Sequence, residues 1–455
     1  MNVMRSVMCV AMVASFLSAQ TSLLEGRSLD DWSSESGGWE WLGDALRGDI
    51  PEGQNEIDLS WTLGGLDDFD LTLRYSASDD AFLLLNLAPH VSDGRGRFNV
   101  TFEHGWREFV VRCRDGKIRG EGKHGDRVRV VGFEGRRVSG PALRFRFKGP
   151  AGSSVVIDKI DLKRLPLEGR RKIVMVAGPM SHGYGAHEHK AGCELLARRL
   201  NVADSGLLAV VYSGGWPADP SAFDNANAVV LYANGGVHHP ANAHLDELRG
   251  WMERGVGVAC LHYGVEVPIG EGGDVFREMI GGYFETHWSV NPHWTAHFEA
   301  LPEHDVTQGV EPFSLHDEWY YNMRFRDEMK GVSPVLTAVP PDKTRERPDG
   351  PHSNNPYVRS RRGAREHVAW VAEREDGGRG FGCTGGHFHW SWGHDQFRRL
   401  VLNSLVWVAG ADVPAGGFVS ETPSVGELMR DQDEEIPVSF DPEKLEAELK
   451  SWNDG

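Results

Sequence analysis

Cysteine is scarce in this 455-residue sequence, where it occurs five times without the close spacing of a metal-binding or redox motif. Cys9 lies in an apolar segment near the N-terminus. The other four are Cys113, Cys193, Cys260 and Cys383. They form no disulfide framework, and we expect them to be small buried apolar residues.

Basic residues are also in the minority, with 48 Lys and Arg against 66 Asp and Glu, which gives a formal net charge of −18. Nucleic acids and anionic membranes both favour a basic surface, so this balance argues against either as a partner. It favours a small or neutral ligand. Beyond the N-terminal segment, no apolar run is long enough to span a membrane.

The N-terminus reads MNVMRSVMCVAMVASFLSAQ, in which Arg5 precedes a short apolar stretch. The stretch ends in the small-residue pattern Leu17-Ser18-Ala19. This three-part pattern is typical of a secretory signal peptide and is too short for a transmembrane helix. We therefore expect residues 1–19 to be a signal peptide and the mature protein to be secreted or periplasmic.

The first part of the mature chain, residues 22–166, alternates short β-type runs with Gly and Asp turns. The predicted strands are DFDLTLRYSA, AFLLLNLA, REFVVRCRDGKI, RVRVVGFEG, ALRFRFKG and SSVVIDKIDLKRL. In the first of them, Phe69, Leu71 and Leu73 alternate with polar residues, as in a strand with one buried face. The pattern predicts an all-β domain, a β-sandwich or jelly roll.

Both ends of this domain carry a family resemblance. The opening LLEGRSLDDWSSESGGWEWLGDALRG and the closing VVIDKIDLKRL resemble the two ends of the 3-keto-disaccharide hydrolase domain, a concanavalin-like sandwich. The middle departs from that domain, because the motif expected to give an open small-molecule face with acidic and His residues is not found there. The resemblance therefore implies a structural or carbohydrate-binding copy of that domain rather than an active one.

Residues 172–413 have a different pattern, in which apolar runs alternate with helical spacing. The predicted strands are KIVMVAGP, LLAVVY, AVVLYA, GVGVACLHYG, PVLTAV, HVAWVAE and GRGFGCTGG. Helices are predicted in SHGYGAHEHKAGCELLARRL and in HLDELRGWMERG. The alternation predicts an α/β domain whose largely parallel sheet is covered on both faces. Residues 414–455 are acidic and predict a surface tail that packs across this domain or is partly disordered.

Histidine is concentrated in the second domain, since only His90, His104 and His124 of the 20 histidines precede it and 17 remain. The clusters are His182, His187 and His189; His262 with Glu266; Glu285 with His287, His293 and His297; His316 with Asp317 and Glu318; and His387, His389 and His394. Any one of them is better explained by a structural role. Together, beyond the carboxyl ends of parallel strands, they predict a site.

His262 ends a predicted strand at the position where an enzyme of the glutamine amidotransferase type places its nucleophile on a sharp elbow. Cys260 lies two residues earlier, down in the sheet, so a Cys-His hydrolase is disfavoured. An imidazole at this elbow can act as a general base or bind a metal. To bind a metal, His262 needs partners such as His387, at the end of another strand, and a carboxylate such as Glu318. This mixture of nitrogen and oxygen ligands is typical of Zn²⁺ sites.

Asp317 and Glu318 lie beside aromatic residues in HDEWYY. A partly apolar pocket raises the pKa of a carboxyl group toward neutrality, which suits general acid/base catalysis. A solvated acidic pair that caps a turn is the alternative. The candidate catalytic residues are His262, His387, Glu318 and Asp317, of which His262, Glu318 and His387 are also the candidate ligands of a divalent metal such as Zn²⁺.

Tryptophans border the His clusters, and flat indole faces beside polar donors suit sugar rings, although most aromatic residues belong to cores. The candidate substrate-binding residues are His187, His189, Glu285, His287, Trp319, His389, Trp390 and Trp392. The predicted partner is therefore a carbohydrate.

The second domain resembles the trehalose-utilisation (ThuA-like) family over nearly all of its length. The motifs that carry the resemblance are VAGPMSHGYGAHEHKAG, GGYFETHWSVNPHW, DEWYYNMRFR, PPDKTRERPDGPHSNNPYVR, GGRGFGCTGGHFHWSWG and FRRLVLNSLVWVAG. The resemblance implies a flavodoxin-like fold of the class I glutamine amidotransferase type without the amidotransferase Cys. It also implies a link to sugar breakdown through 3-keto-glycosides. The 3-keto-disaccharide hydrolase domain, which the first part of the chain resembles, is named after the same class of substrate.

These features predict an enzyme that cleaves 3-keto-glycosides by acid/base chemistry, with or without a metal, through elimination or hydrolysis. A protein that binds carbohydrate without catalysis is the alternative, favoured by the degenerate sandwich. A metal-dependent hydrolase of esters or amides is a third possibility.

Overall fold

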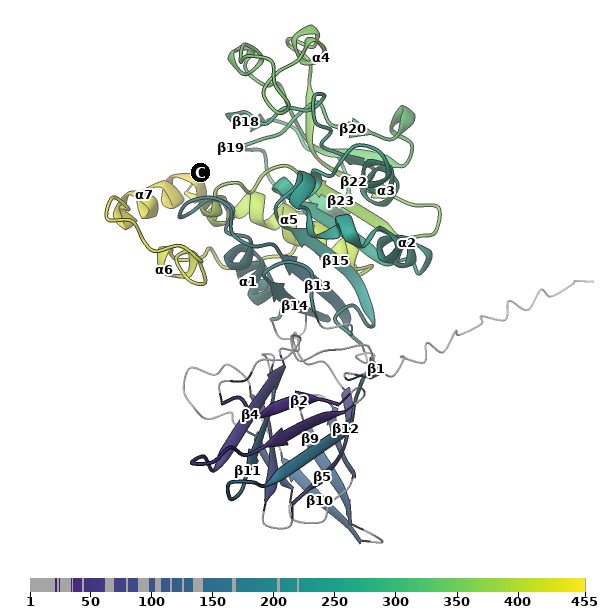
Figure 1. The fold of residues 1–455 in the computed structure, drawn as a ribbon. Coiled ribbons are helices and arrows are strands. Elements are labelled where there is room, and N and C mark those ends of the chain that lie inside the picture. Colours follow the sequence, from purple (N-terminus) through teal and green to yellow (C-terminus); the bar gives the residue numbers. More distant parts are fainter. Residues whose placement is uncertain are drawn as a thin grey trace, which may run out of the picture. The chain divides into compact units, whose positions relative to one another are not determined.

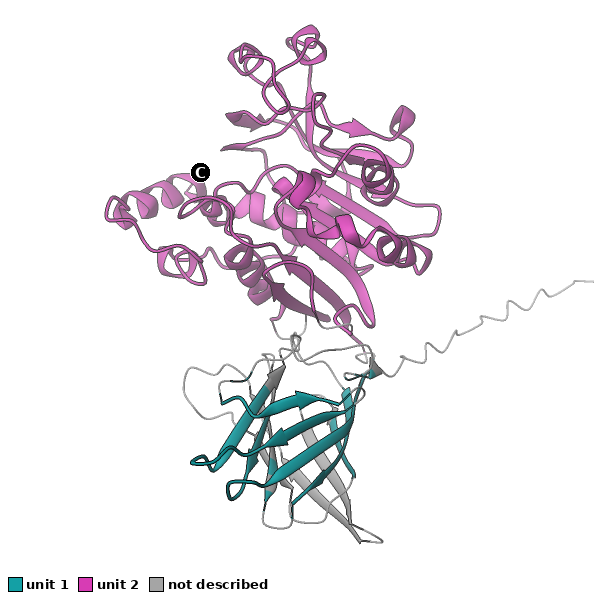
Figure 2. Cartoon of the chain, viewed as in Figure 1, with its two compact units in different colours: residues 1–61, 66–138, 143–166 teal, residues 62–65, 139–142, 167–455 magenta. Residues whose placement is uncertain are grey.

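The fold is described from a computed structural model of the chain. The described residues are 21–22, 24, 34, 36–42, 45–61, 69–78, 81–88, 98–102, 108–114, 117–124, 127–133, 142–165, 169–202, 205–218 and 221–454. The predicted signal peptide lies outside them. Figure 2 shows two compact units, the first comprising residues 1–61, 66–138 and 143–166 and the second residues 62–65, 139–142 and 167–455.

The first unit is a β-sandwich of two antiparallel sheets (Figure 1). Its strands are β1 (Thr21–Ser22), β2 (Trp39–Trp41), β3 (Leu46–Asp49), β4 (Glu56–Trp61), β5 (Phe69–Ala77), β6 (Phe82–Ala88), β7 (Phe98–Phe102), β8 (Glu108–Arg114), β9 (Lys117–His124), β10 (Arg127–Phe133), β11 (Ala142–Lys148) and β12 (Ser154–Arg164). One sheet has the order β10-β9-β8-β5-β12-β3-β2, with β1 paired to β12, and the other has the order β4-β11-β6-β7. Five of the six predicted runs each contain one strand, and the run REFVVRCRDGKI contains β8 and the start of β9, which confirms the all-β prediction.

Alternating burial explains this sandwich. In β5 the side chains of Phe69, Leu71 and Leu73 are at most 1% exposed, while the residues between them are not buried. Ile57 and Leu59 of β4 are equally buried, which gives the opposing sheet its own apolar face. Two such faces pack together because each removes apolar surface from water.

The second unit is built on a seven-stranded sheet of order β14-β13-β15-β16-β23-β22-β21. Its strands are β13 (Arg171–Ala177), β14 (Leu207–Ser213), β15 (Ala226–Tyr232), β16 (Gly257–Leu261), β21 (Val332–Ala338), β22 (Glu366–Glu373) and β23 (Arg379–Cys383). The strands from β14 to β23 in this order are parallel, and β22 pairs antiparallel with both of its neighbours, β23 and β21. The sheet is thus largely parallel, as predicted.

Helices cover both faces of this sheet, as Figure 1 shows. The helices of this unit are α1 (His189–Leu200), α2 (Leu245–Glu253), α3 (Glu271–Ile280), α4 (Pro356–Ser360), α5 (Asp395–Val408), α6 (Val425–Leu428) and α7 (Pro442–Asn453). In β13, Ile173 and Met175 pack in the core that contains α1 and α5. Val174 and Val176 pack in the core that contains α2 and α3. Both faces of the sheet are therefore buried, which explains why its strands are continuously apolar rather than alternating.

A segment inserted between α3 and β21 adds two small antiparallel pairs. They are β17 (Gly282–Tyr283) with β20 (Arg324–Phe325), and β18 (His293–Phe298) with β19 (Phe313–Glu318). In β18 the burial alternates, with Trp294, Ala296 and Phe298 buried and His293, Thr295 and His297 exposed. This insertion was not assigned any secondary structure from the sequence.

The cysteines of the described core match their prediction. Cys193, Cys260 and Cys383 are free and completely buried. Burial raises the pKa of the Cys260 thiol, which excludes it as a thiolate nucleophile at neutral pH.

In the described part of the chain, no helix has both the length and the apolar character to cross a bilayer.

The C-terminal residues add to the core on the α1 and α5 side, because Leu428, Leu445 and Leu449 belong to it. A Cβ atom placed on Gly393 would lie 2.2 Å from Leu449 Cδ2, so α7 sits directly on the turn before α5.

We predict that Leu449→Ala lowers the free energy of unfolding of the second unit by about 2 kcal/mol, because it removes a buried side chain and leaves a void. Denaturant unfolding followed by tryptophan fluorescence would measure this. The exposed neighbour Glu448 provides the control, and Glu448→Ala should change the value by less than about 0.5 kcal/mol. Equal effects of the two substitutions would show that α7 does not pack as described.

Candidate metal centre

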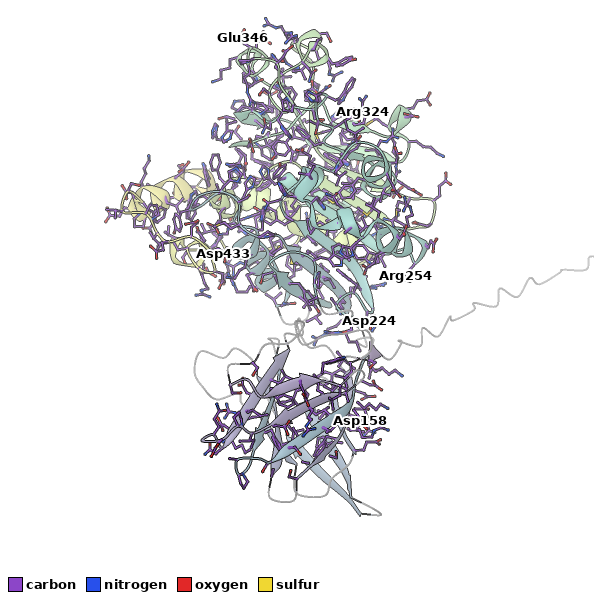
Figure 3. All side chains as sticks on the ribbon, in the orientation of Figure 1. Asp158, Asp224, Arg254, Arg324, Glu346 and Asp433 are labelled. Atoms are coloured by element: carbon purple, nitrogen blue, oxygen red, sulfur yellow. The ribbon has the colours of Figure 1, made fainter. Side chains whose placement is uncertain are left out.

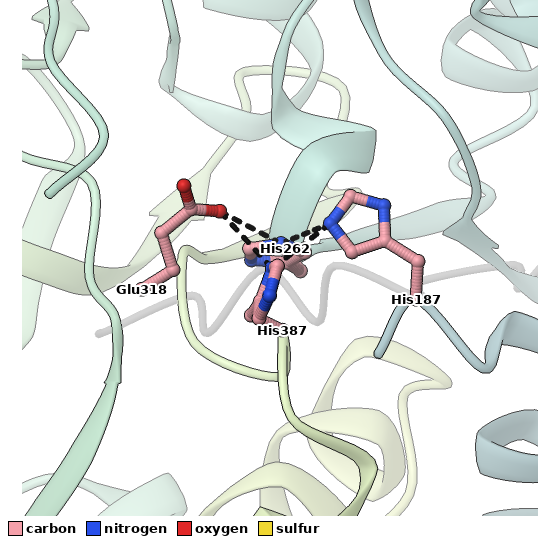
Figure 4. Close-up of side chains that lie close together, drawn as sticks. All are labelled: His187, His262, Glu318 and His387. Carbon is pink, nitrogen blue, oxygen red and sulfur yellow. Dashed lines mark hydrogen bonds and ion pairs between the residues drawn. The ribbon is translucent and has the colours of Figure 1, made fainter. Parts of the chain in front are cut away.

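Three histidines follow three parallel strands of the second unit. His187 lies in the loop after β13, His262 follows β16 and His387 lies in the loop after β23. Because the carboxyl ends of parallel strands meet at one edge of a sheet, these imidazoles converge. Glu318, the last residue of β19, joins them from the inserted segment. Figure 4 shows the four side chains directed toward one another.

The backbone at two of these positions is strained. His262 has a φ of 50° and His187 a φ of 52°, in the left-handed region that favours glycine. The chain therefore turns sharply as it leaves β16, as expected for an elbow. The turn also needs Gly264, where a Cβ atom would lie 2.6 Å from the carbonyl oxygen of Leu231. Strain of this kind is concentrated at functional sites.

The four side chains offer one donor atom each, and these atoms all lie within 4.8 Å of one another. His187 Nε2 is 3.0 Å from His262 Nε2 and 3.0 Å from His387 Nδ1. Glu318 Oε2 is 3.1 Å from His387 Nδ1 and 3.5 Å from His262 Nε2. Ligands of a tetrahedral ion with bonds of 2.0–2.1 Å are about 3.3 Å apart, so the spacing suits such an ion.

The tautomer of His262 is set by the backbone. Its Nδ1 lies 2.8 Å from the carbonyl oxygen of Thr384, which can only accept a hydrogen bond. The Nδ1–H group therefore donates to Thr384, and Nε2 directs a lone pair into the cluster. A ligand histidine whose second nitrogen donates to a carbonyl is the usual arrangement at metal sites.

A chain of hydrogen bonds sets the tautomer of His187 in the same way. The side-chain amide of Asn234 donates to the carbonyl oxygen of Pro179 at 3.0 Å, which turns its Oδ1 toward Ser181. The Ser181 hydroxyl donates its proton to that oxygen at 2.5 Å. Ser181 Oγ must then accept from His187 Nδ1, 3.1 Å away. His187 Nε2 is left with a lone pair that also faces the cluster.

Two nitrogen lone pairs thus face each other at 3.0 Å, an arrangement that a cation or a proton between them would stabilise. A proton is disfavoured, because burial lowers the pKa of His187 and lowers that of His262 to about 3. Burial alone would raise the pKa of Glu318, but hydrogen bonds from His293 and His387 hold it well below its usual range. Neutral imidazoles and an ionised carboxylate are the forms that bind a metal.

The cluster therefore fits a divalent cation such as Zn²⁺. Three imidazole nitrogens and one carboxylate oxygen are a ligand set that Zn²⁺ takes, and all four side chains are buried. The expected ligands His262, Glu318 and His387 are brought together, and His187, which was assigned to substrate, joins them.

Asp317 does not face this cluster, although it is adjacent to Glu318. Its completely buried carboxylate accepts hydrogen bonds from the backbone N–H groups of Gly386 and His387, at 3.1 and 3.0 Å, and from the Ser391 hydroxyl at 2.7 Å. Burial raises the pKa of this carboxyl group. Asp317 holds the loop that carries His387, and the predicted role as a catalytic acid is replaced by this positioning role.

Several side chains expected to contact substrate belong to the core instead. Trp319, His389 and Trp392 are completely buried, so they present no face to a ligand. His189 is also buried and lies 3.2 Å from the carbonyl oxygen of Pro179. Large apolar rings next to polar loops are better explained here by packing than by sugar binding.

The remaining candidates lie outside the cluster. Trp390 is half-buried and stacks on Phe440, with ring centroids 5.3 Å apart. Glu285 pairs with Arg324, labelled in Figure 3, whose Nε is 3.0 Å away. His287 is exposed and has a left-handed backbone, with a φ of 65°.

Three residues beside the cluster were not assigned to the site from the sequence. The Tyr320 hydroxyl lies 3.1 Å from His262 Nε2, and His293 Nε2 lies 3.5 Å from Glu318 Oε1. The ring of the exposed His182 lies tilted by 35° against that of His187, with centroids 3.7 Å apart. The pairing of β18 with β19 places His293 opposite Glu318. Recognising this hairpin in the sequence would have identified His293 as a neighbour of Glu318.

A cavity of about 400 Å³ opens beside Glu318. It is lined by Asn291, Pro292, His293, Glu318, Lys343, Thr344 and Arg347. Glu318 thus belongs to both the cluster and the cavity, and His293, beside the cluster, also lines the cavity, which gives the cluster a space for a small molecule.

Comparison with known proteins adds a family match. The model of the family ThuA, described as trehalose utilisation, matches residues 181–408, half of the chain. A ThuA-like protein from Bacteroides uniformis has 17% identity over 55% of this chain and 95% of its own, with a TM-score of 0.39. A glycosyl hydrolase from Parabacteroides distasonis has 9% identity over 32% of this chain and 100% of its own, with a TM-score of 0.23. A search of curated protein sequences gives no match.

We predict that Asp317→Asn weakens Zn²⁺ binding about 10- to 100-fold, because an amide cannot accept all the hydrogen bonds that fix the His387 loop. Competition with a chromogenic chelator would measure the affinity. Asp327→Asn, at an exposed acidic residue, is the control and should leave it unchanged. An unaltered affinity in a folded Asp317→Asn protein would contradict the positioning role.

We also predict that acid destabilises the second unit even without metal. Burial lowers the pKa of His189, His239 and His389 from 6.5 to about 4. Between these values the unfolded chain binds more protons than the folded one, so stability falls as pH falls through this window, by up to about 1.4 kcal/mol per pH unit for each residue. Thermal unfolding in the presence of a chelator should show a lower Tm at pH 5 than at pH 7.5. A constant Tm would be inconsistent with neutral buried imidazoles.

Proposed function

Since the chain belongs to the trehalose-utilisation (ThuA) family, we propose that it is a metal-dependent enzyme that cleaves 3-keto-glycosides. The observation that supports this most strongly is the convergence of His187, His262, His387 and Glu318, with two imidazole lone pairs directed at one point. A secreted or periplasmic location, inferred from the N-terminal pattern, is part of the same proposal.

The chemistry uses the ketone of the substrate. A carbonyl group at C3 acidifies the C2 proton, so a base removes that proton and negative charge develops on the C3 oxygen. The electron pair then forms the C1–C2 double bond as the C1–oxygen bond breaks, and the leaving oxygen takes up a proton. Addition of water across the C1–C2 bond completes a net hydrolysis.

When bound, a divalent cation supplies Lewis acidity, which stabilises negative charge on a substrate oxygen. His187, His262, His387 and Glu318 would hold it, and all four are therefore assigned as ligands rather than as acids or bases. Thr384, Ser181 and Asp317 act behind them, because they fix the orientation of the imidazoles.

Proton transfer falls to His293 in this arrangement. Its side chain is 45% exposed and lines the cavity, and its ring lies 4.9 Å from that of His387. A hydrogen bond with Glu318 raises its pKa above the usual value for histidine, which brings it into the range suited to exchange of protons at neutral pH. The Tyr320 hydroxyl, 3.1 Å from His262 Nε2, would provide an O–H donor to developing charge.

The test is an assay of the zinc-loaded full chain on a 3-keto-glucoside with a chromogenic leaving group, beside the parent glucoside. We expect release from the ketone only, and a loss of at least about 100-fold in kcat/KM for His262→Ala and His387→Ala. In D₂O the sugar product should carry deuterium at C2, since elimination and hydration exchange that position.

His297→Ala is the matched control, because His297 lies on β18 but is exposed and hydrogen-bonded to Ser314. Its activity should equal that of the unmodified chain. Unchanged turnover in both ligand variants would overturn the proposed enzyme. Sugar binding without any product would instead favour a protein that binds carbohydrate without catalysis.

A further inference from the structure

The cavity beside Glu318 contains positive charge that cleavage of a neutral glycoside does not use. We propose that the substrate of this site is anionic, a sugar derivative whose carboxylate or phosphate group binds between Lys343 and Arg347. This inference rests on the proposed function, because it assigns the substrate class of the same site.

Lys343 and Arg347 belong to a densely charged loop in which the other charged residues form ion pairs. In residues 343–347, Arg345 pairs with Glu366 at 3.1 Å. Glu346, at the outer end of the second unit in Figure 3, pairs with Arg362 at 3.3 Å. Within the part of the chain that the structure describes, neither Lys343 nor Arg347 forms an ion pair, and both line the cavity.

The loop is held in place before any ligand binds. The Asn354 side-chain amide donates to the carbonyl oxygens of Arg345 and Arg347, both at 2.7 Å. The Tyr321 hydroxyl lies 2.9 Å from Thr344 Oγ1. A preorganised loop binds an anion more tightly, because little conformational entropy is lost on binding.

Arg347 is half-buried and has a weak neutral partner. Both of its terminal nitrogens lie near Asn291 Oδ1, at 3.4 and 3.3 Å. A guanidinium group removed from water without an anion is costly, and its planar pair of donors matches a carboxylate or a phosphate. A neutral sugar would leave this cost in place.

The sign of the cavity contrasts with that of the whole chain, whose net charge is −18. Glu318 is the single carboxylate among the lining residues, and as a ligand its charge is balanced by the cation. Lys343 and Arg347 then make the cavity positive in an otherwise acidic protein, so it attracts anions. The substrate would span from the reacting centre at Glu318 to its acidic group at these two residues.

Isothermal titration of the zinc-loaded full chain with glucose, glucuronate, glucose 6-phosphate and inorganic phosphate tests the proposal. We expect at least one anionic sugar to bind about tenfold or more tightly than glucose. Arg347→Gln and Lys343→Gln should each remove most of this preference without changing the bound zinc or the affinity for glucose. Comparison of the two anionic sugars identifies the acidic group.

Lys330→Gln is the control, since Lys330 pairs with Glu375 on the surface and should have no effect. Equal affinities for glucose and both anionic sugars, with zinc bound, would overturn the anionic substrate and leave the proposed function intact. Binding of inorganic phosphate but of neither anionic sugar would also overturn it. Failure to bind zinc would count against the proposed function, and repeating the titrations without metal keeps the anion preference measurable.

Discussion

The second unit depends on one unfavourable contact, the approach of two imidazole lone pairs to within 3.0 Å of each other. The single N–H group of each ring points away from this contact, because His262 Nδ1 donates to Thr384 and His187 Nδ1 donates to Ser181. The Tyr320 hydroxyl, 3.1 Å from His262 Nε2, can donate to only one of the two lone pairs. The fold imposes this contact through strained turns after parallel strands. The strain and the repulsion both become useful when a cation lies between the nitrogens, which is why the cluster is better explained as a binding site than as a packed core.

The parallel sheet and the inserted segment contribute different parts of the site. Loops after β13, β16 and β23 provide nitrogen ligands, and the segment between α3 and β21 provides the oxygen ligand Glu318. The same insertion carries His293, and the following chain carries Lys343 and Arg347. In the proposed mechanism, metal binding would therefore depend on the sheet edge, while proton transfer and charge selection would depend on the segments that cover it. Changes in those segments could alter the substrate without loss of the metal centre.

Much of the fold could be predicted because apolar runs and turn residues reveal strands without tertiary information. His262 and His387 were also accessible, since strand ends in an α/β domain mark the binding edge. Asp317 and Glu318 show where prediction of the site from the sequence fails. Neighbours on a strand point to opposite faces, so one of them had to face away from the site, but the sequence does not tell which. Likewise, Trp319 and Trp392 are large apolar residues that suit either the core or a binding surface. Only their complete burial in the structure shows that they belong to the core.

The order of strands in the sheet has a consequence for how the protein is made. β23 is the last strand of this sheet along the chain, yet it lies between β16 and β22, which precede it. A nascent chain that ends before residue 379 lacks both the strand between β16 and β22 and the third imidazole, so it could not hold a cation with the complete ligand set. Closure of the sheet requires contacts between distant parts of the chain, which are slow to form. Acquisition of the metal would therefore mark the end of folding in this unit and would lock the last strand in place.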